Sequence, residues 1–425
     1  ADGLLNQNIP VPFTLKKIQF RLSSYGPIIQ NFQTCVKCSY QHHLFPQGYL
    51  RCAEVQLTLA ISFTKGWSVS MRMTMGMLLA LALMPLLSRA LQVGQVRLLA
   101  AQHNMTSILV FGDSSVDPGN NNILPTTMKS NYPPYGKDFF DGRPTGRFSN
   151  GRLATDFIAE AIGYTKIVPA FLDPNLKPKD MLHGVSFASA ASGYDDLTAN
   201  LSNVFSVSNQ LEYFMHYLIH MRDFVGEKKT TDIIRYAVFV LSMGTNDFLQ
   251  NYYLQPIRSK QFKVEKYQDY LVSCMSRDIE LMHRLGATKL VVVGVPPLGC
   301  MPLVKTLMEK TGCVESYNKV AFSFNSKIQT KLSTLKAKLR MKIAFVDAYS
   351  IIDNAVNNPT LYDIDETSKG CCGTGTVEYG DSCKGLSTCT DPTKYVFWDA
   401  VHPTQKMYKI IANEALKSLS AELLS

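Results

Sequence analysis

The chain has 425 residues, of which 46% are hydrophobic and 10% aromatic, a composition that excludes a fibrous or largely disordered protein and suffices for one large domain or two ordinary ones. The net charge of +9 is unevenly placed: residues 1–90 carry eight Lys and Arg against two acidic side chains, and the remainder carries 35 against 32. The main body is nearly neutral, so we expect no nucleic-acid partner.

Residues 71–90 have the layout of a secretory signal peptide. Arg72 gives a positive start, Met75 to Leu87 form an apolar core of 13 residues, and Ser88 and Ala90 are small residues in a cleavage-like arrangement. Thirteen residues are too few to cross a hydrocarbon layer of about 30 Å, so we expect no stable membrane span. We predict a secreted, extracellular protein in which residues 1–70 are an upstream extension, unstructured or an artefact of the gene model. The alternative for 71–90 is a buried core helix.

Two groups of residues have the character of metal ligands. One lies near the start of the chain and comprises Cys35, Cys38, His42, His43 and Cys52. Its spacing is looser than that of known zinc motifs. The other is His216 and His220, four residues apart on a predicted helix with no third ligand nearby, which we interpret as packing residues. We therefore expect neither a metal nor a cofactor.

Five short apolar runs predict buried β-strands, at residues 108–111, 184–188, 237–241, 289–294 and 342–346. The first run ends at Gly112-Asp113-Ser114-Ser115, a tight turn of small polar residues. Ligands bind at the carboxyl ends of the strands in an open parallel sheet, so Ser114 is a candidate nucleophile. Its alternative role is a helix N-cap.

Helical patterns separate these strands, at residues 153–162, 208–225, 264–285, 314–339 and 403–419. Strands that alternate with helices indicate βαβ crossovers and a parallel sheet covered on both faces. We therefore predict an α/β fold, a three-layer α/β/α sandwich with a central, mainly parallel five-stranded sheet. No second domain and no internal repeat is evident, and we place the domain at residues 105–422.

The cysteines of the body fit an oxidising compartment. Four lie within a segment rich in Gly, Ser and Thr, at positions 371, 372, 383 and 389, and disulfides would staple this segment, although their pairing is not readable from sequence. Cys300 and Cys313 flank a short excursion and are able to pair, which leaves Cys274 as the odd thiol. In a secreted chain, Asn104-Met-Thr106 and Asn200-Leu-Ser202 become candidate glycosylation sites.

Near the end of the chain, Asp399 stands three residues before His402, just ahead of a predicted helix. This spacing allows the carboxylate to hold one imidazole nitrogen while the other accepts a proton from a serine. The alternative is a capping Asp beside an incidental surface His. No Gly-x-Ser-x-Gly elbow occurs, which disfavours the common α/β-hydrolase arrangement.

These features together resemble the plant-type GDSL esterase/lipases of the SGNH hydrolase superfamily. The resemblance covers about Ser107 to Leu419, and its blocks occur in the family's order. They are Phe111-Gly-Asp-Ser-Ser-Val-Asp117, Gly184-Val-Ser-Phe-Ala-Ser-Ala-Ala-Ser-Gly193, Gly244-Thr-Asn-Asp247 and Asp399-Ala-Val-His402-Pro403. Ser115 stands where the family name has Leu. Gly294 to Cys300 and Cys371 to Gly375 are also similar to plant members.

The resemblance implies a flavodoxin-like SGNH hydrolase fold and a set of site residues. Ser114 would be the nucleophile and His402 the general base, oriented by Asp399. The backbone N–H groups of Ser114 and Gly193 and the side chain of Asn246 would form the oxyanion hole, whose donors stabilise the charge that develops on the substrate carbonyl.

The expected function is a secreted serine hydrolase that cleaves carboxylic esters, of lipid, acyl or cell-wall type, through an acyl-serine intermediate. The expected partner is a small-molecule or lipid ester, and the oligomeric state is left open. Two alternatives remain: an acyltransferase that passes the same acyl group to an alcohol, and a non-catalytic wall-binding protein on the same scaffold.

Overall fold

A computed structural model describes residue 94 and residues 96–423, all within one compact unit of the chain. The predicted leader at 71–90 and the extension at 1–70 lie outside the described residues. The central sheet has five parallel strands in the order β2-β1-β3-β4-β5. Their bounds are β1 Ile108–Gly112, β2 Gly184–Ser186, β3 Val238–Ser242, β4 Lys289–Val293 and β5 Lys342–Val346. The predicted fold class is confirmed.

The strand order places a topological switch point beside β1. The chain runs from β1 to β2 on one side and then crosses to β3 on the other side of β1. In the register of β1 with β3, Val110 lies opposite Val240 and Gly112 opposite Ser242. The connections leave β1 and β3 in opposite directions, which opens a crevice at their carboxyl ends where ligands of such sheets bind.

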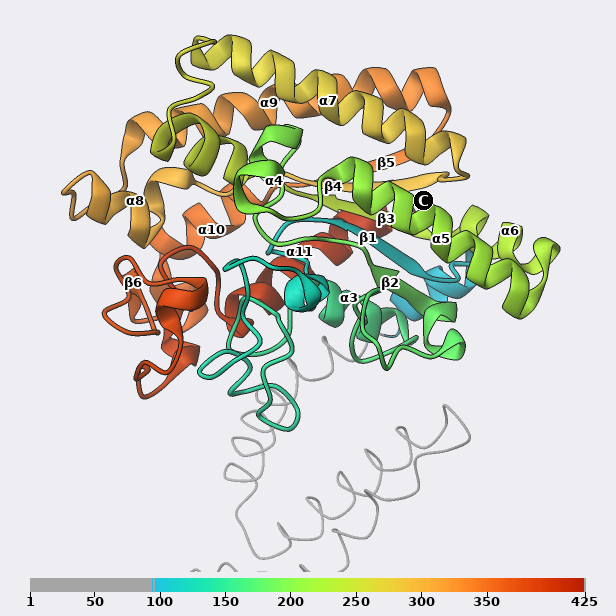
Figure 1. Cartoon of the computed structure of the whole chain (residues 1–425), viewed down its shortest axis with the longest axis horizontal. Helices are drawn as coiled ribbons and strands as arrows, with labels where there is room; N and C mark the ends of the chain where they lie inside the picture. The colour runs from blue at the N-terminus through green and yellow to red at the C-terminus, as the bar shows by residue number, and fades with distance from the viewer. Residues whose placement is uncertain (1–93, 95, 424–425) are drawn as a thin grey trace, which may run out of the picture. The chain divides into compact units, whose positions relative to one another are not determined.

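Helices cover both faces of this sheet (Figure 1). Helices α5, α7 and α9 lie on one face, where α5 contacts β1 and α9 contacts β5, and α3 and α11 pack together on the other. The α-helices are α3 Ala154–Ile162, α4 Asp196–Ser202, α5 Val207–Val225, α6 Glu227–Tyr236, α7 Val264–Arg284, α8 Pro302–Leu307, α9 Glu315–Leu339, α10 Ala348–Asn357 and α11 Gln405–Glu422. A π-helix, η4, spans Asp247–Leu254, and short 3-10 turns include η7 Gly380–Cys383.

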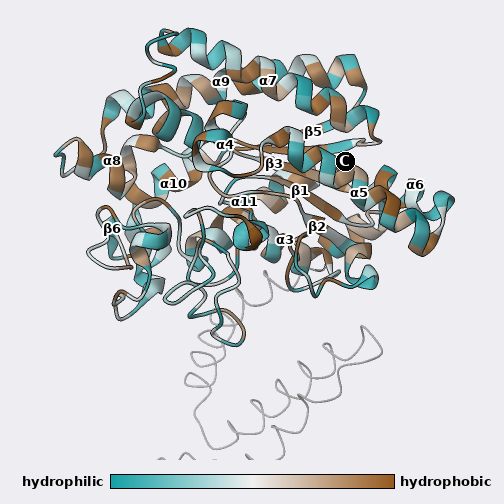
Figure 2. Cartoon of the chain, viewed as in Figure 1, coloured by the Kyte–Doolittle hydropathy of each residue, from teal (hydrophilic) through white to brown (hydrophobic). Residues whose placement is uncertain are grey.

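The two faces of the sheet carry side chains of different size. Toward α5 the core is aromatic: the ring of Phe111 lies 6.0 Å from Phe239 and 5.7 Å from Phe214. Because side chains alternate along a strand, the neighbours Val238 and Val240 face α3 and α11 instead. Figure 2 shows the hydrophobic residues on the strands and the inner sides of the helices, with hydrophilic residues outside.

A second, two-stranded parallel sheet joins β6 Glu366–Gly370 to β7 Tyr395–Phe397. Strand β6 was not predicted from sequence, because its residues are mostly polar and half exposed and show no apolar alternation. Disulfides staple the segment that follows, Cys371 to Cys389 and Cys372 to Cys383. Cys300 pairs with Cys313 as expected, and Cys274 is free and buried.

Two expectations require correction. The last helix begins at Gln405 rather than Pro403, because Thr404 caps it by accepting a hydrogen bond from the Met407 N–H. His216 and His220 are exposed on α5 rather than buried in the core, and each packs at the surface beside one aromatic ring, His216 at 6.1 Å from Tyr213 and His220 at 6.3 Å from Phe171. The described part of the chain contains no cluster of three or more His, Cys, Asp or Glu arranged for a metal, and no helix in it is long and apolar enough to span a bilayer.

Candidate active site

Ser114 lies in the turn that follows β1, and the backbone of this turn is tightly held. Gly112, with a φ of +153°, ends the strand, and a Cβ there would stand 2.2 Å from the carbonyl oxygen of Ser242 on β3. Only glycine permits this close approach. The Gln210 side chain accepts a hydrogen bond from the Gly112 N–H and donates one to its carbonyl oxygen. The turn is therefore fixed on both sides, and Ser114 retains 9% exposure at the sheet edge.

His402 connects Ser114 to Asp399 through direct hydrogen bonds. Its Nε2 lies 2.8 Å from Ser114 Oγ, and its Nδ1 lies 2.8 Å and 2.9 Å from the two carboxylate oxygens of Asp399. Asp399 is fully buried and His402 is 6% exposed. A carboxylate on Nδ1 keeps the proton there, so that Nε2 is free to accept a proton from the serine hydroxyl.

Asp399 and His402 sit on a closed loop between β7 and α11. The Trp398 N–H donates to the His402 carbonyl oxygen at 2.7 Å, and Phe397 forms a bridge with Pro403. The Asp399 carboxylate also accepts the His402 backbone N–H at 2.7 Å. These contacts explain how a spacing of three residues aims one side chain at the other.

A second layer of contacts holds Asp399 from the opposite side. Tyr135 Oη donates to Asp399 Oδ2 at 2.7 Å, and the Gly380 N–H donates to the same tyrosine oxygen at 2.8 Å. The ring of Tyr135 packs against Phe148 and Trp398 in the disulfide-linked cluster. Tyr135 was not predicted as a site residue, because nothing in a Pro-Pro-Tyr-Gly stretch indicates contact with a residue near the other end of the chain.

Hydrogen-bond donors lie on the same side of the sheet. The backbone N–H groups of Ser114 and Gly193 have no hydrogen-bond acceptor within the described residues. Asn246 Nδ2 lies 3.0 Å from the carbonyl oxygen of Ser192, the residue before Gly193, and 3.5 Å from Asp113 Oδ2. The structure therefore joins Ser114, His402 and Asp399 directly, and connects Asn246 with the residues that adjoin Ser114 and Gly193.

The loop at Gly193 is fixed by a buried carboxylate. Asp247 accepts hydrogen bonds from the Tyr194 and Asp195 N–H groups and from the Thr198 hydroxyl. A Cβ on Gly193 would stand 2.2 Å from Asp247 Oδ1, so no larger residue fits without a shift. Asp247 is part of the quoted Gly244–Asp247 block, but its contact with Gly193 was not predicted from sequence.

Burial raises the pKa of three carboxyl groups near the Ser114 turn and the Gly193 loop. Burial raises the pKa of Asp247 to about 7, although its three donors lower it in part. Burial likewise raises the pKa of Asp117 to about 6, and that of Asp113 beside the serine. These carboxyl groups hold their protons more readily than surface ones, because a buried charge is poorly solvated.

Comparison with known proteins identifies the family. Residues 108–415 match the GDSL-like lipase/acylhydrolase family, so the chain belongs to it. A GDSL esterase/lipase of Arabidopsis thaliana is 56% identical over 349 residues, which cover 82% of this chain and 98% of that protein. A second from the same plant is 43% identical over 317 residues, covering 73% and 91%. The protein is accordingly a carboxylic ester hydrolase.

Solved structures resemble the chain more distantly. A catalytic mutant of an acetylxylan esterase from Geobacillus stearothermophilus is 12% identical, covers 74% of this chain and 94% of its own, and has a TM-score of 0.35. A lipase from a goat rumen metagenome is also 12% identical, covers 75% and 99%, and has a TM-score of 0.34. At these scores neither structure supports an argument about the site.

Proposed function

We propose that this protein is a secreted serine esterase that works through an acyl-serine intermediate. In the first half-reaction, Ser114 Oγ attacks the ester carbonyl carbon while His402 Nε2 takes the serine proton. The bond to the alcohol then breaks, and His402 returns that proton to the leaving oxygen. In the second half-reaction, water attacks the acyl-serine, His402 takes a water proton, and the free acid leaves as Ser114 regains its hydrogen.

One observation carries this proposal: His402 lies 2.8 Å from both Ser114 Oγ and the Asp399 carboxylate. The negative charge of the tetrahedral intermediate would be met by the Ser114 and Gly193 N–H groups and by the Asn246 amide. Each such donor contributes on the order of 10²-fold or more in rate. The reaction needs no metal or cofactor, and its partner is a small-molecule or lipid ester.

Secretion is the second part of the proposal, with the hydrolase domain at residues 105–422. Three disulfides support an oxidising compartment. The acceptors Asn104 and Asn200 are both exposed, as glycosylation requires. Mass analysis of the protein collected from plant-cell medium tests this part: we expect an N-terminus after residue 90. Retention of the intact chain inside the cell would contradict it.

The mechanism is tested with Ser114→Ala and, as a control, Ser333→Ala, which is exposed on α9. We expect kcat to fall by about 10⁴-fold or more in the first variant and to stay near wild type in the second. Mass spectrometry of wild-type protein quenched during turnover should find the acyl group on the peptide that contains Ser114. Undiminished ester cleavage by Ser114→Ala would overturn the mechanism. With an alcohol acceptor present, a dominant transfer product would make the protein an acyltransferase instead.

A further inference from the structure

Two cavities meet at Ser114. The outer cavity is lined by Phe148, Leu303 and Tyr379 and extends to Leu254, which is 47% exposed, so it reaches the surface. The inner cavity runs between the sheet and the layer of α3 and α11. Both are lined by Ser114, Asn246, Val401 and His402. A substrate held at Ser114 therefore has room on two sides.

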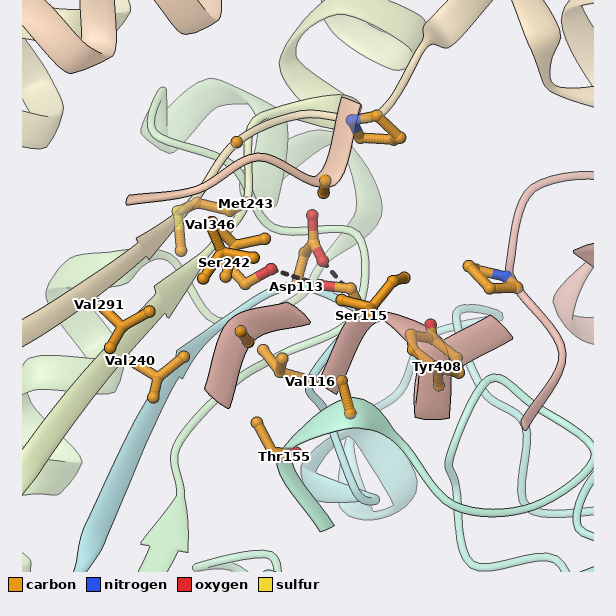
Figure 3. A pocket seen from close by; sticks show the side chains of 18 of the residues that line it. Asp113, Ser115, Val116, Thr155, Val240, Ser242, Met243, Val291, Val346 and Tyr408 are labelled. Carbon is orange, nitrogen blue, oxygen red and sulfur yellow. Dashed lines mark hydrogen bonds between the residues drawn. The ribbon is translucent and has the colours of Figure 1, made fainter. Parts of the chain in front are cut away.

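The inner cavity arises because small side chains line that face of the sheet. Its sheet wall consists of Val238, Val240, Ser242, Val291, Val293 and Val346. Figure 3 shows three of these valines along one wall, with Val116, Thr155 and Tyr408 opposite. On this face the valines lie opposite alanines and isoleucines of the helices, and space remains between the two layers. On the other face of the sheet, aromatic rings fill the corresponding space. The residues that line the inner cavity surround a volume of about 120 Å³.

The cavity is long and extends away from Ser114. Along α11 it is lined by Tyr408, Ile411, Ala415 and Leu419, successive positions on one side of the helix. At 1.5 Å per residue, these eleven steps span about 16 Å. Along α3 the lining continues from Ala154 to Ile162, and Met105 lies at the far end with Ile108. The cavity therefore runs along the length of β1 and β3, from their carboxyl ends to their amino ends.

Polar groups occur only near the Ser114 end of this cavity. They include Asp113, Ser115, Ser242, Thr155 and Tyr408. The hydroxyl of Tyr408 is buried and has no hydrogen-bond partner within the described residues, so an oxygen of a bound ester would give it one. Beyond this end the lining is aliphatic. An aliphatic cavity does not attract water and binds apolar ligands, and it offers no donors or acceptors to a sugar.

We infer that the inner cavity binds the acyl chain of the substrate, and that the enzyme selects esters of long, unbranched fatty acids. The inference rests on the proposed role of Ser114, because the carbonyl must sit at that hydroxyl while the hydrocarbon extends along α11. The alcohol portion of the ester then occupies the outer cavity and leaves toward solvent. Each methylene that the cavity buries is removed from water, which is favourable, so affinity and kcat/KM rise with chain length until the cavity is filled.

Ser115 keeps the mouth of the cavity open. It occupies the position where the family name has Leu, and its hydroxyl lies 2.8 Å from that of Ser242. Figure 3 shows this pair beside Asp113 at the polar end of the cavity. A leucine at 115 would place a branched side chain in the mouth, and the Ser115→Leu variant should therefore accept long chains poorly.

The test compares p-nitrophenyl acetate, octanoate and palmitate, which differ only in the acyl chain. For the full-length wild-type protein we expect kcat/KM to rise from acetate to the longer esters. Ala415→Phe places a ring midway along the cavity and should lower the palmitate-to-acetate ratio of kcat/KM at least tenfold. Asn413→Phe, two residues away on the exposed side of α11, is the matched control and should keep the wild-type ratio.

The outcomes separate this inference from the proposed function. If Ser114→Ala retains activity, the proposed function fails. If wild-type protein acts through Ser114 but the palmitate-to-acetate ratio is the same in wild type and Ala415→Phe, the acyl-chain site is refuted and the proposed function stands.

Ala415→Leu is a second variant that fills the cavity with a smaller side chain. Because the packing leaves space beside Ala415, both filling variants should keep a melting temperature near wild type. Failure of both to fold would also refute the site, since a filled core rejects added atoms.

Discussion

Tyr135 Oη donates a hydrogen bond of 2.7 Å to Asp399 Oδ2, although 264 residues separate the two in sequence. The same oxygen accepts the N–H of Gly380, so its own proton is directed at the carboxylate. Tyr135 thus connects the disulfide-linked segment with the residue that orients His402. Burial and the negative charge of Asp399 raise the tyrosine pKa well above its usual range, so the hydroxyl stays protonated and remains a donor.

We predict that Tyr135→Phe lowers kcat by about 10- to 100-fold with little change in KM. A hydrogen bond to a charged group contributes about 1.5–3 kcal/mol, and 1.4 kcal/mol corresponds to a factor of ten. Tyr132→Phe is the control, because the Tyr132 hydroxyl bonds to Asp381 rather than to Asp399. The kcat and KM values of both variants are measured by steady-state kinetics. Equal kcat values in the two would show that Tyr135 has no positioning role.

The second prediction concerns the glycine of the oxyanion loop. Gly193→Ala should lower kcat by on the order of 10²-fold and also lower the melting temperature, because the new methyl group meets the Asp247 carboxylate. Gly312→Ala is the matched control, since nothing lies within 4 Å of a Cβ built there. Kinetics and thermal unfolding are measured together. A Gly193→Ala protein with wild-type kcat would exclude this loop from the oxyanion hole.

The pH dependence of stability gives a third prediction. Burial raises the pKa of Asp278 on α7 from 3.8 to about 7. The folded protein keeps this proton at pH 5 while the unfolded chain has lost it, so the stabilisation is complete below pH 3.8 and is lost as the pH rises through 7. Asp278→Asn stays neutral and should be more stable than wild type at pH 8, with the difference shrinking at pH 5.

The melting temperatures of Asp278→Asn and wild type are compared by thermal unfolding at several pH values. A gain of about 1 kcal/mol at pH 8 would raise the melting temperature by roughly 2–4 °C. Asp223→Asn, exposed on α5, serves as the control for removing one negative charge. The prediction is wrong if the two variants have parallel pH profiles.

The disulfides provide the fourth prediction. Replacing Cys372 and Cys383 by serine should lower stability by about 2–4 kcal/mol and also lower kcat, because the bridge ends at the turn that places the Gly380 N–H. The same double substitution at Cys300 and Cys313 opens a loop of similar length. That variant should lose stability while keeping kcat. If kcat is unchanged in both variants, the disulfide-linked segment does not help to position the active-site residues.

Local patterns were sufficient to predict the strands, the turn that carries Ser114 and the pairing of Asp399 with His402, whereas the family resemblance supplied Gly193 and Asn246 as site residues. The five apolar runs became the five strands, and the blocks that contain Ser114, Gly193, Asn246 and His402 all reach one side of the sheet. Each of these features is encoded within about ten residues of chain. The order of the strands was not predicted, since apolar runs alone do not specify which strands pair.

Contacts between distant segments were not predictable in the same way. Tyr135 meets Asp399, and Asp247 holds the loop at Gly193, through tertiary packing that has no local signature. The strand β6 lacked an apolar pattern because it pairs only with β7 and stays half exposed. The inner cavity depends on how the valines of three strands face α3 and α11, which follows from register and layer packing rather than from any single stretch.

The closed loop from Trp398 to Pro403 divides the active site into two mechanical parts. Asp399 and His402 are tied to each other by backbone and side-chain hydrogen bonds, so they move together as one body. Ser114 belongs to the other body, the sheet. Within the described residues, the only hydrogen bond that joins this loop to the sheet and its turns is the one between Ser114 Oγ and His402 Nε2. A displacement of this loop relative to β1 would therefore change the distance over which the proton must travel and leave the acid–imidazole geometry intact.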